Sequence, residues 1–362
     1  MSSHSVTNFN NKGGNPRNSE GAFLTLRDGR IMFAYTAYYS DGRGGDDDPA
    51  NIVAVFSDDD GRTWGKERIV VVNEGKWNVM SVSLLRLQNG RIAIFYLCKN
   101  SSFDCRPWVR FSDDEGETWS EPVATMHRLG YFVLNNDRAV QLKSGRIILP
   151  LSHHYNVVMA DNPEKVSIEG RGLFCVVMSD DNGATWQEGS ERWQLPSGPG
   201  YLQEPGVVEL ADGRVWCFMR TNIGRQWQSF SSDQGETWSV PKPSRFQSPR
   251  APMSVKRNPH TGALLAIWDD AALATKMWGE KKKLREGWLK DASWGRTPLV
   301  MAESRDEGRR WTRSRVIEDD PDHGFCYIAI HFTDEALLLG YCCGGGDDSH
   351  VLQNLRVRRI PF

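Results

Sequence analysis

The sequence predicts an all-β fold, a six-bladed β-propeller, on three observations. An octet of the form Ser-x-Asp-x-Gly-x-Thr-Trp recurs, apolar strands alternate around short glycine turns, and both patterns return at blade-sized intervals. Each unit is then a four-stranded antiparallel blade. The chain has 362 residues, and one closed domain over 1–362 is favoured over two average domains because repeat folds run long as single units.

The octets are expected to be structural turns. An Asp side chain can accept hydrogen bonds from N–H groups further along, the Gly can adopt a left-handed conformation, and the Trp can pack back on the sheet. The carboxylates are therefore predicted to hold hairpins at the rim and to take no part in catalysis. The five octets are 57–64, 112–119, 179–186, 231–238 and 304–311, the last with Arg310 in place of Thr.

A hairpin opens each unit, and the last unit closes the ring. The hairpin turns are expected at Asp28-Gly29, Asn89-Gly90, Ser144-Gly145, Asp212-Gly213, Thr261-Gly262 and, without glycine, Asp334-Glu335. The sixth unit has no octet. Its third strand is expected at 352–357, and the opposite terminus supplies its fourth at 5–9. The Lys- and Glu-rich stretch 271–289 is expected to be helical and to lie outside the ring.

Composition narrows the classes of partner. The 44 basic and 46 acidic residues give a net charge of −2 without a basic run, which predicts no nucleic-acid partner. The first fifteen residues are polar and no eighteen apolar residues run together, which predicts no membrane partner and a cytoplasmic protein unless a leader was removed. The seven cysteines lack a metal-ligand spacing, so we expect free buried thiols, no metal and no cofactor.

The candidate site is expected where the first strands of the blades face the central channel. The segments that begin these strands carry charged side chains, which packing alone does not require. A guanidinium fork matches a carboxylate, so the arginines indicate an anionic, hydroxyl-rich ligand. Equally, pairs such as Asp137 and Arg138 could serve only to lock blades together. The candidates are Arg17, Glu20, Asp137, Arg138, Glu204, Arg250 and Tyr327.

Over most of the chain the octets resemble the Asp boxes, or BNR repeats, of the sialidase (neuraminidase) superfamily. The resemblance implies a six-bladed propeller that releases terminal sialic acids. It implies an arginine triad for the substrate carboxylate, a Tyr–Glu nucleophile pair and an Asp acid/base. Glu204 and Arg220 resemble the family's Glu and second arginine, Arg296 the third arginine, and Tyr327 the nucleophile.

Blade one departs from the family pattern. The family's Arg-Ile-Pro is absent, so Arg17 is assigned as the first arginine. Asp47 is assigned as the acid/base, with Asp41, Asp46 and Asp48 as alternatives. Six further polar residues have no family role; they are Glu20, Asn136, Asp137, Arg138, His153 and His154. Of these, Glu20, Asp137, Arg138 and His153 are assigned to substrate binding, together with Arg250.

The chemistry agrees with these residue types. A sialoside carries a carboxylate on its anomeric carbon, which would repel a carboxylate nucleophile, whereas a phenol activated by a base avoids that repulsion. An unperturbed tyrosine has a pKa of about 10, so Glu204 is needed as base for Tyr327. The two groups are predicted to lie roughly 2.6 to 3.2 Å apart.

Three functions remain open at this level. The first is a retaining exo-glycoside hydrolase that releases a terminal sialic acid or another acidic sugar. The second is a polysaccharide lyase or a glycosidase acting on uronic-acid glycans in the same site; in the lyase, His153 or His154 and a tyrosine would serve as base and acid. The third is a carbohydrate-binding propeller without catalysis. In each case the expected partner is an acidic carbohydrate.

Overall fold

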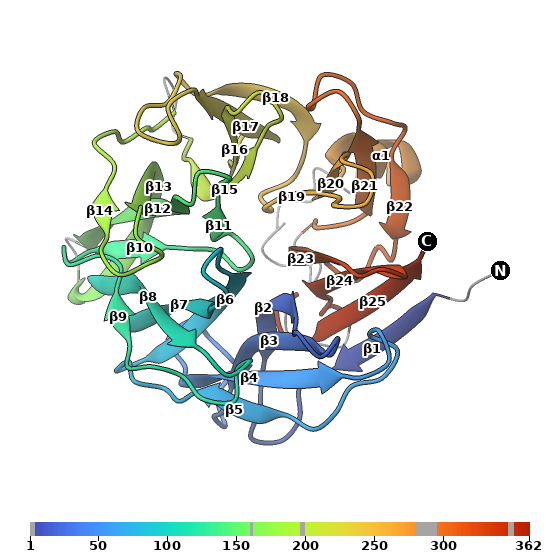
Figure 1. Ribbon diagram of the computed structural model, residues 1–362. Helices are drawn as coiled ribbons and strands as arrows, with labels where there is room; N and C mark the ends of the chain where they lie inside the picture. The colour runs from blue at the N-terminus through green and yellow to red at the C-terminus, as the bar shows by residue number, and fades with distance from the viewer. Residues whose placement is uncertain (1–3, 160–161, 196–199, 280–294, 347–350) are drawn as a thin grey trace.

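The computed structural model describes residues 4–159, 162–195, 200–279, 295–346 and 351–362. Within these residues the strands form five sheets, which Figure 1 shows arranged in a ring. The chain passes from sheet to sheet round this ring. Every strand pairing is antiparallel except the contact between β8 and β10, as the alternating strands and short turns predict.

Four of the sheets have four strands each. The first sheet contains β2 (Asn18–Thr25), β3 (Ile31–Tyr38), β4 (Ala50–Ser57) and β5 (Arg68–Val71). Two further sheets contain β15 (Gln203–Glu209), β16 (Val215–Arg220), β17 (Arg225–Ser231) and β18 (Lys242–Gln247), and β19 (Ser254–Arg257), β20 (Leu264–Asp269), β21 (Leu299–Ser304) and β22 (Arg315–Glu318). The last contains β23 (Cys326–Phe332), β24 (Ala336–Cys342), β25 (Leu355–Pro361) and β1 (Ser5–Phe9).

The remaining sheet has nine strands and covers the second and third sequence units. The short strand β10 pairs with β12 on one side and meets β8 in parallel at Tyr131 and Cys105, and this joins the two units. The sequence predicted two separate sheets here. The strands are β6 (Asn78–Arg86), β7 (Ile92–Ser101), β8 (Asp104–Ser112), β9 (Val123–Ala124), β10 (Tyr131–Val133), β11 (Val140–Gln141), β12 (Ile147–Met159), β13 (Asn162–Ser179) and β14 (Gln187–Glu188).

The two termini close the ring. Strand β1 pairs antiparallel with β25, in a register that runs from Ser5 opposite Arg359 to Phe9 opposite Leu355. Figure 1 shows these blue and red strands side by side. The prediction that residues 5–9 complete the last sheet is confirmed, and β25 provides the expected third strand slightly later than 352–357.

The hydrophobic core lies between neighbouring sheets. One cluster combines Phe33 of β3 with Leu338 of β24, so the first and last sheets share a core. Another combines Met219 of β16 with Phe174 of β13, and a third combines Trp216 of β16 with Ala266 of β20. Strands buried on both faces read as continuous apolar runs, which explains sequences such as that of β3.

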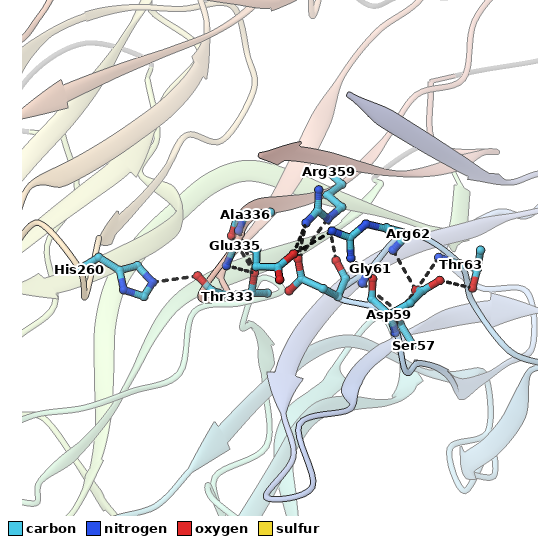
Figure 2. Close-up of polar contacts among 11 residues, drawn as sticks. Ser57, Asp59, Gly61, Arg62, Thr63, His260, Thr333, Glu335, Ala336 and Arg359 are labelled. Atoms are coloured by element: carbon cyan, nitrogen blue, oxygen red, sulfur yellow. Dashed lines mark hydrogen bonds and ion pairs between the residues drawn. The ribbon is translucent and has the colours of Figure 1, made fainter. Parts of the chain in front are cut away.

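The octets form the turns between the third and fourth strands of their units. In the first octet, the Ser57 hydroxyl donates to Asp59 Oδ1 at 2.8 Å and accepts from the Gly61 N–H at 2.8 Å. Asp59 also accepts from the Thr63 N–H and hydroxyl at 2.8 and 2.7 Å (Figure 2). The same contacts recur around Asp114, Asp181 and Asp233. The expected turn-holding role of these carboxylates is confirmed.

The first octet also contacts the last sheet. Arg62 Nη2 donates to Glu335 Oε2 at 2.7 Å, and Arg359 of β25 reaches the same carboxylate at 3.3 Å (Figure 2). These ion pairs, in which Arg359 is buried while Arg62 and Glu335 are exposed, connect the two sheets at which the ring closes. They add to the strand pairing between β1 and β25.

We expect Asp114→Ala to lower stability and to leave turnover per folded molecule unchanged. Asp114 accepts from the Ser112 hydroxyl at 2.8 Å and from the Thr118 N–H at 2.9 Å, so the alanine variant loses the cap of its turn. The melting temperature should fall by roughly 2 to 4 °C. The control is Asp113→Ala, which removes only an exposed ion pair with Arg91. Equal melting temperatures for the two variants would contradict this role.

A short helix follows β20. The helix α1 (Ala271–Trp278) begins at the cap Asp270, whose side chain accepts from Ala272 N and Leu273 N. It covers the first part of the predicted helix 271–289, and the rest from 280 lies outside the described residues.

All seven cysteines are free and buried, as expected. No helix in the described ranges is long and apolar enough to cross a membrane.

Candidate active site

A cavity of about 820 Å³ collects polar side chains from successive sheets. Its lining includes Glu20 of β2, Ser81 of β6, Glu204 of β15 and Tyr327 of β23. Arg220, at the end of β16, and two arginines from loops also line it. Residues far apart in the sequence therefore meet where the first strands of the sheets converge.

A β-bulge places each of these first four side chains. In each strand the pairing register shifts at this residue, so that two residues oppose one on the neighbouring strand. The bulged residues have positive φ angles: Glu20 59°, Ser81 60°, Glu204 45° and Tyr327 60°. A left-handed residue interrupts the alternation of the strand and re-aims its side chain. Positive φ at non-glycine residues is uncommon and concentrates at functional sites.

Asn136 fixes two of these bulges from across the ring. Its side-chain Nδ2 donates to the Gly21 carbonyl at 2.8 Å and to the Tyr327 carbonyl at 3.0 Å. Asn136 is buried. The sequence assigns no role to Asn136; its amide binds the backbone next to Glu20 and at Tyr327, so it positions these two residues.

Tyr327, Glu204 and Arg220 form a connected chain of contacts. The Tyr327 hydroxyl donates to Glu204 Oε1 at 3.0 Å, within the predicted range, and Arg220 Nη1 lies 2.5 Å from Glu204 Oε2. Burial alone would raise the pKa of Glu204, but the charges of Arg220 and Arg296 and the hydrogen bonds from Arg220 and Tyr327 together hold that pKa below the usual range. Burial and the Glu204 charge raise the pKa of Tyr327. The phenol thus keeps its proton and directs it at a carboxylate able to accept it.

Three arginines line the cavity, namely Arg220, which contacts Glu204, and Arg250 and Arg296. Arg296 Nη1 donates to Cys326 Sγ at 2.9 Å, and its Cζ lies 5.5 Å from the Tyr327 ring centroid. Arg250 lies over the Tyr201 ring at 5.1 Å. Burial, and then the charge of Arg220, lower the pKa of Arg250. An anion in the cavity would relieve this repulsion between cations.

Arg17 is not part of this cluster. It is 1% exposed and is absent from the cavity lining. Its Nη1 donates to Asp46 Oδ1 at 2.7 Å and to the Gly44 carbonyl at 3.3 Å. The loop packs directly on it, because a Cβ added to Gly44, which has a φ of 72°, would fall 2.7 Å from Arg17 Cβ. The structure therefore does not bring Arg17 to the cavity, where it was expected, and Arg250 is the third arginine in the lining.

The loop before β4 brings Asp46, and not Asp47, to the cavity. Asp46 lines the cavity, and Asp41 and Asp47 are exposed and lie outside the lining. Asp48 Oδ2 accepts from the Gly44 and Gly45 N–H groups at 2.8 and 3.0 Å, which folds the loop. Lys99 Nζ holds the Asp46 carbonyl at 2.8 Å. The geometry gives no support to Asp47 as acid/base.

Asp137 and Arg138 join sheets and do not line the cavity. Lys256 Nζ lies 2.9 Å from Asp137 Oδ1, and the Ile330 N–H donates to Asp137 Oδ2 at 3.0 Å. Arg138 donates to Ser254 Oγ at 3.1 Å and to the Met253 carbonyl at 2.7 Å. Their assignment to substrate binding is corrected, because the alternative role of locking blades together accounts for these contacts.

His153 and His154 lie on opposite faces of β12. His154 of β12 lines the cavity, and its Nε2 lies 3.0 Å from Ser152 Oγ. His153 points to the other face of the strand, where its ring stacks on Phe132 with ring centroids 4.4 Å apart. It does not line the cavity, so the structure does not support its predicted role in substrate binding. Burial lowers the pKa of each histidine to about 4, so both are neutral at physiological pH.

Sequence reasoning missed Ser81 and the bulges. Ser81 comes one residue after the segment considered as the start of its strand, and nothing in its residue type marks a left-handed bulge. No group of three His, Cys, Asp or Glu side chains within the described parts of the chain could hold a metal ion. The cavity is thus lined by three arginines and by a hydrogen-bonded Tyr–Glu pair.

Comparison with known proteins agrees with the octets and the ring. The BNR repeat-like domain family matches residues 29–339. Sialidase-3 of Mus musculus is 25% identical in an alignment of 203 positions that covers 49% of this chain and 47% of that protein. The match thus spans about half the length of the curated relative.

Solved structures show the same fold. A Dyadobacter fermentans protein of unknown function superposes with a TM-score of 0.73 at 16% identity, over 99% of this chain and all of that one. Trypanosoma rangeli sialidase in complex with the inhibitor DANA gives 0.72 at 16% identity, over 99% of this chain and 59% of the sialidase. The Hadza microbial sialidase Hz136 gives 0.70 at 16% identity, over 97% and 66%. At these identities the likeness concerns the fold alone.

Proposed function

The chain belongs to the BNR repeat-like domain family, and from this premise we propose that it is an exo-acting glycoside hydrolase for a terminal sialic acid or a related acidic sugar. The carrying observation is the 3.0 Å contact between the Tyr327 hydroxyl and Glu204 in a cavity that three arginines also line. A phenol nucleophile with a carboxylate base suits a sugar whose own carboxylate would repel an anionic nucleophile.

We infer one domain over 1–362, with six blades and five Asp boxes. Counting the nine-stranded sheet as two blades joined through β10 gives six units, since the other four sheets contribute one each. The hydrophobic clusters shared by neighbouring sheets support a continuous ring.

In the proposed reaction the substrate carboxylate binds Arg220, Arg250 and Arg296. Arginine binds carboxylates in a bidentate fork, which fixes the orientation of the sugar as well as its position. Tyr327 attacks the anomeric carbon while its proton passes to Glu204. Hydrolysis of the resulting glycosyl–tyrosine would release the sugar with its anomeric configuration retained. These steps use side chains of the protein and water, without a cofactor.

A screen of aryl glycosides tests the proposal. We expect hydrolysis of an aryl sialoside, or of an aryl glycoside of another acidic sugar, with release of the phenol. A lyase would instead form a product with a new double bond that absorbs in the ultraviolet, and neutral His154 in the cavity is the base it would use. A protein that binds acidic sugars and turns none over would leave only the carbohydrate-binding function.

We expect Arg250→Lys to weaken the binding of an acidic sugar. The variant keeps the charge and loses the fork, so the loss should be about 1.5 to 3 kcal/mol, or roughly 10- to 150-fold in Kd. Titration calorimetry with N-acetylneuraminic acid measures it. The control is Arg245→Lys, an exposed arginine of β18 outside the cavity lining, which should leave Kd unchanged. Equal Kd values for the two variants would count against the clamp.

A further inference from the structure

Glu20 is a buried carboxyl group that the reaction proposed above does not use. It projects into the cavity from the β2 bulge, and its side chain is 5% exposed. The Ser81 hydroxyl donates to Oε2 at 3.1 Å, and Arg17 Nη2 lies 3.8 Å from Oε1, beyond hydrogen-bond distance. Strands β2 and β23 pack against each other through Phe23 and Ala329, so Glu20 and Tyr327 stand on neighbouring strands.

The other carboxylates of the cavity are held by guanidinium groups. Asp46 Oδ1 lies 2.7 Å from Arg17 Nη1, and its side chain is 61% exposed. Glu204 lies 2.5 Å from Arg220 Nη1 and accepts from Tyr327. In each of these pairs the carboxylate accepts a hydrogen bond from a guanidinium N–H, whereas no guanidinium N–H lies within hydrogen-bond distance of Glu20 in the contacts described above.

The environment of Glu20 favours its protonated form. Burial raises its pKa to about 7, with the Arg17 charge only partly opposing that effect. At neutral pH the Glu20 carboxyl group therefore exists in both its protonated and its ionised form, whereas the lowered pKa of Glu204 keeps that carboxylate ionised. Two carboxyl groups in one site whose environments push their pKa values apart divide the roles of acid and base between them.

We propose that Glu20 is the residue that protonates the leaving oxygen and later deprotonates the attacking water in the hydrolase proposed above. The inference rests on that proposed function and on the geometry of the β2 bulge. It assigns the role to a glutamate of the first strand, in place of any of the four aspartates in the loop 41–48.

Glu20 and Glu204 together account for every proton that is transferred in the two steps. As Tyr327 Oη bonds to the anomeric carbon, the bond to the leaving oxygen breaks, Glu204 takes the phenol proton and Glu20 gives its proton to the leaving alcohol. In the second step Glu20 takes a proton from water, and the oxygen of that water bonds to the anomeric carbon. The bond to Tyr327 breaks, and Glu204 returns its proton to the phenol.

The test is the dependence of turnover on the leaving group. A 4-nitrophenyl glycoside of the acidic sugar needs little help in leaving, whereas the methyl glycoside needs a proton. For Glu20→Gln we expect kcat/KM to fall by roughly 10²- to 10⁴-fold on the methyl glycoside and by about tenfold or less on the 4-nitrophenyl glycoside. Asp46→Asn is the matched control from the same cavity, and it should change both substrates by the same factor.

The pH profile gives a second readout. The wild-type protein should lose kcat/KM on the methyl glycoside as the pH rises through about 7, because Glu20 gives up the proton it must donate. The Glu20→Gln variant should lack this alkaline limb. An unchanged limb in the variant would overturn the assignment.

A thermal melt tests the buried acid without turnover. The pKa is raised in the folded state, so the stability that Glu20 contributes is present at low pH and is lost as the pH rises through about 7. Glu20→Gln should therefore match the wild type at pH 4, below the unfolded-state pKa of about 4.3, and melt several degrees higher at pH 8. If the variant and the wild type have equal melting temperatures at both pH values, the pKa of Glu20 is not raised and the assignment fails.

The outcomes separate the two proposals. If the wild type hydrolyses the glycosides and Glu20→Gln loses the same factor on both, the Glu20 assignment fails and the hydrolase stands. If Asp46→Asn alone shows the leaving-group effect, the acid is Asp46. If the wild type hydrolyses neither substrate, both proposals fail.

Discussion

Replacing Tyr327 by phenylalanine is expected to remove most turnover and to leave the binding of an acidic sugar nearly unchanged. The variant loses only the hydroxyl that donates to Glu204 at 3.0 Å, while the three arginines of the cavity remain. Loss of a nucleophile should lower kcat by roughly 10³-fold or more. Steady-state kinetics on an aryl glycoside of the acidic sugar and calorimetry with the free sugar measure the two effects separately.

The chain offers a matched control for this variant. The Tyr341 hydroxyl donates to Glu318 Oε1 at 2.6 Å, and Arg356 and Arg358 contact the same glutamate at 2.8 and 2.7 Å. This is a second Tyr–Glu–Arg group, but it lies outside the cavity lining. Tyr341→Phe should therefore cost stability and keep kcat per folded molecule. Near-normal kcat for Tyr327→Phe would refute the nucleophile assignment.

Replacing Glu204 by glutamine is expected to lower kcat by roughly 10²- to 10⁴-fold. Glutamine fits the same space and can still accept a hydrogen bond from Tyr327, but it cannot take up the phenol proton. The wild-type profile should extend to low pH, because the lowered pKa of Glu204 keeps the carboxylate ionised below the usual carboxyl range. Activity should fall only as the pH drops through that lowered value.

Glu318→Gln controls for the loss of a buried charge beside arginines. Glu318 pairs with Arg356 at 2.8 Å, as Glu204 pairs with Arg220 at 2.5 Å, so both variants leave an arginine without its carboxylate. Only Glu204→Gln should lower kcat per folded molecule. A similar loss in both variants would mean that Glu204 acts through stability alone.

The sequence predicted the local turns and the ring-closing strand because their causes are local or periodic. Each octet carries its own hydrogen-bond partners within a few residues, as Asp59 does with Ser57 and Thr63. The strand 5–9 shows the alternation of exposed and partly buried residues that is typical of an edge strand. It pairs with β25, which without it would be the unpaired edge of the last sheet. The contact between Tyr327 and Glu204 was predicted from a resemblance that places both residues at equivalent points of their units.

The rest of the site depends on pairings that the sequence does not display. Arg17 precedes a strand that faces the channel, but the loop containing Gly44 covers it, and Arg250 from another unit faces the cavity instead. Asp46 and Asp47 are adjacent, and the hydrogen bonds to Asp48 decide which one reaches the cavity.

The sequence by itself determined the repeat, the turns that hold it and the residue types available for chemistry. The tertiary structure decided which of these side chains face one another. The physical reason is the left-handed bulge at Glu20, Ser81, Glu204 and Tyr327, a backbone state that none of these residue types prefers. Pairing with neighbouring strands, and the bonds of Asn136 to two of these segments, impose that state only once the ring is assembled.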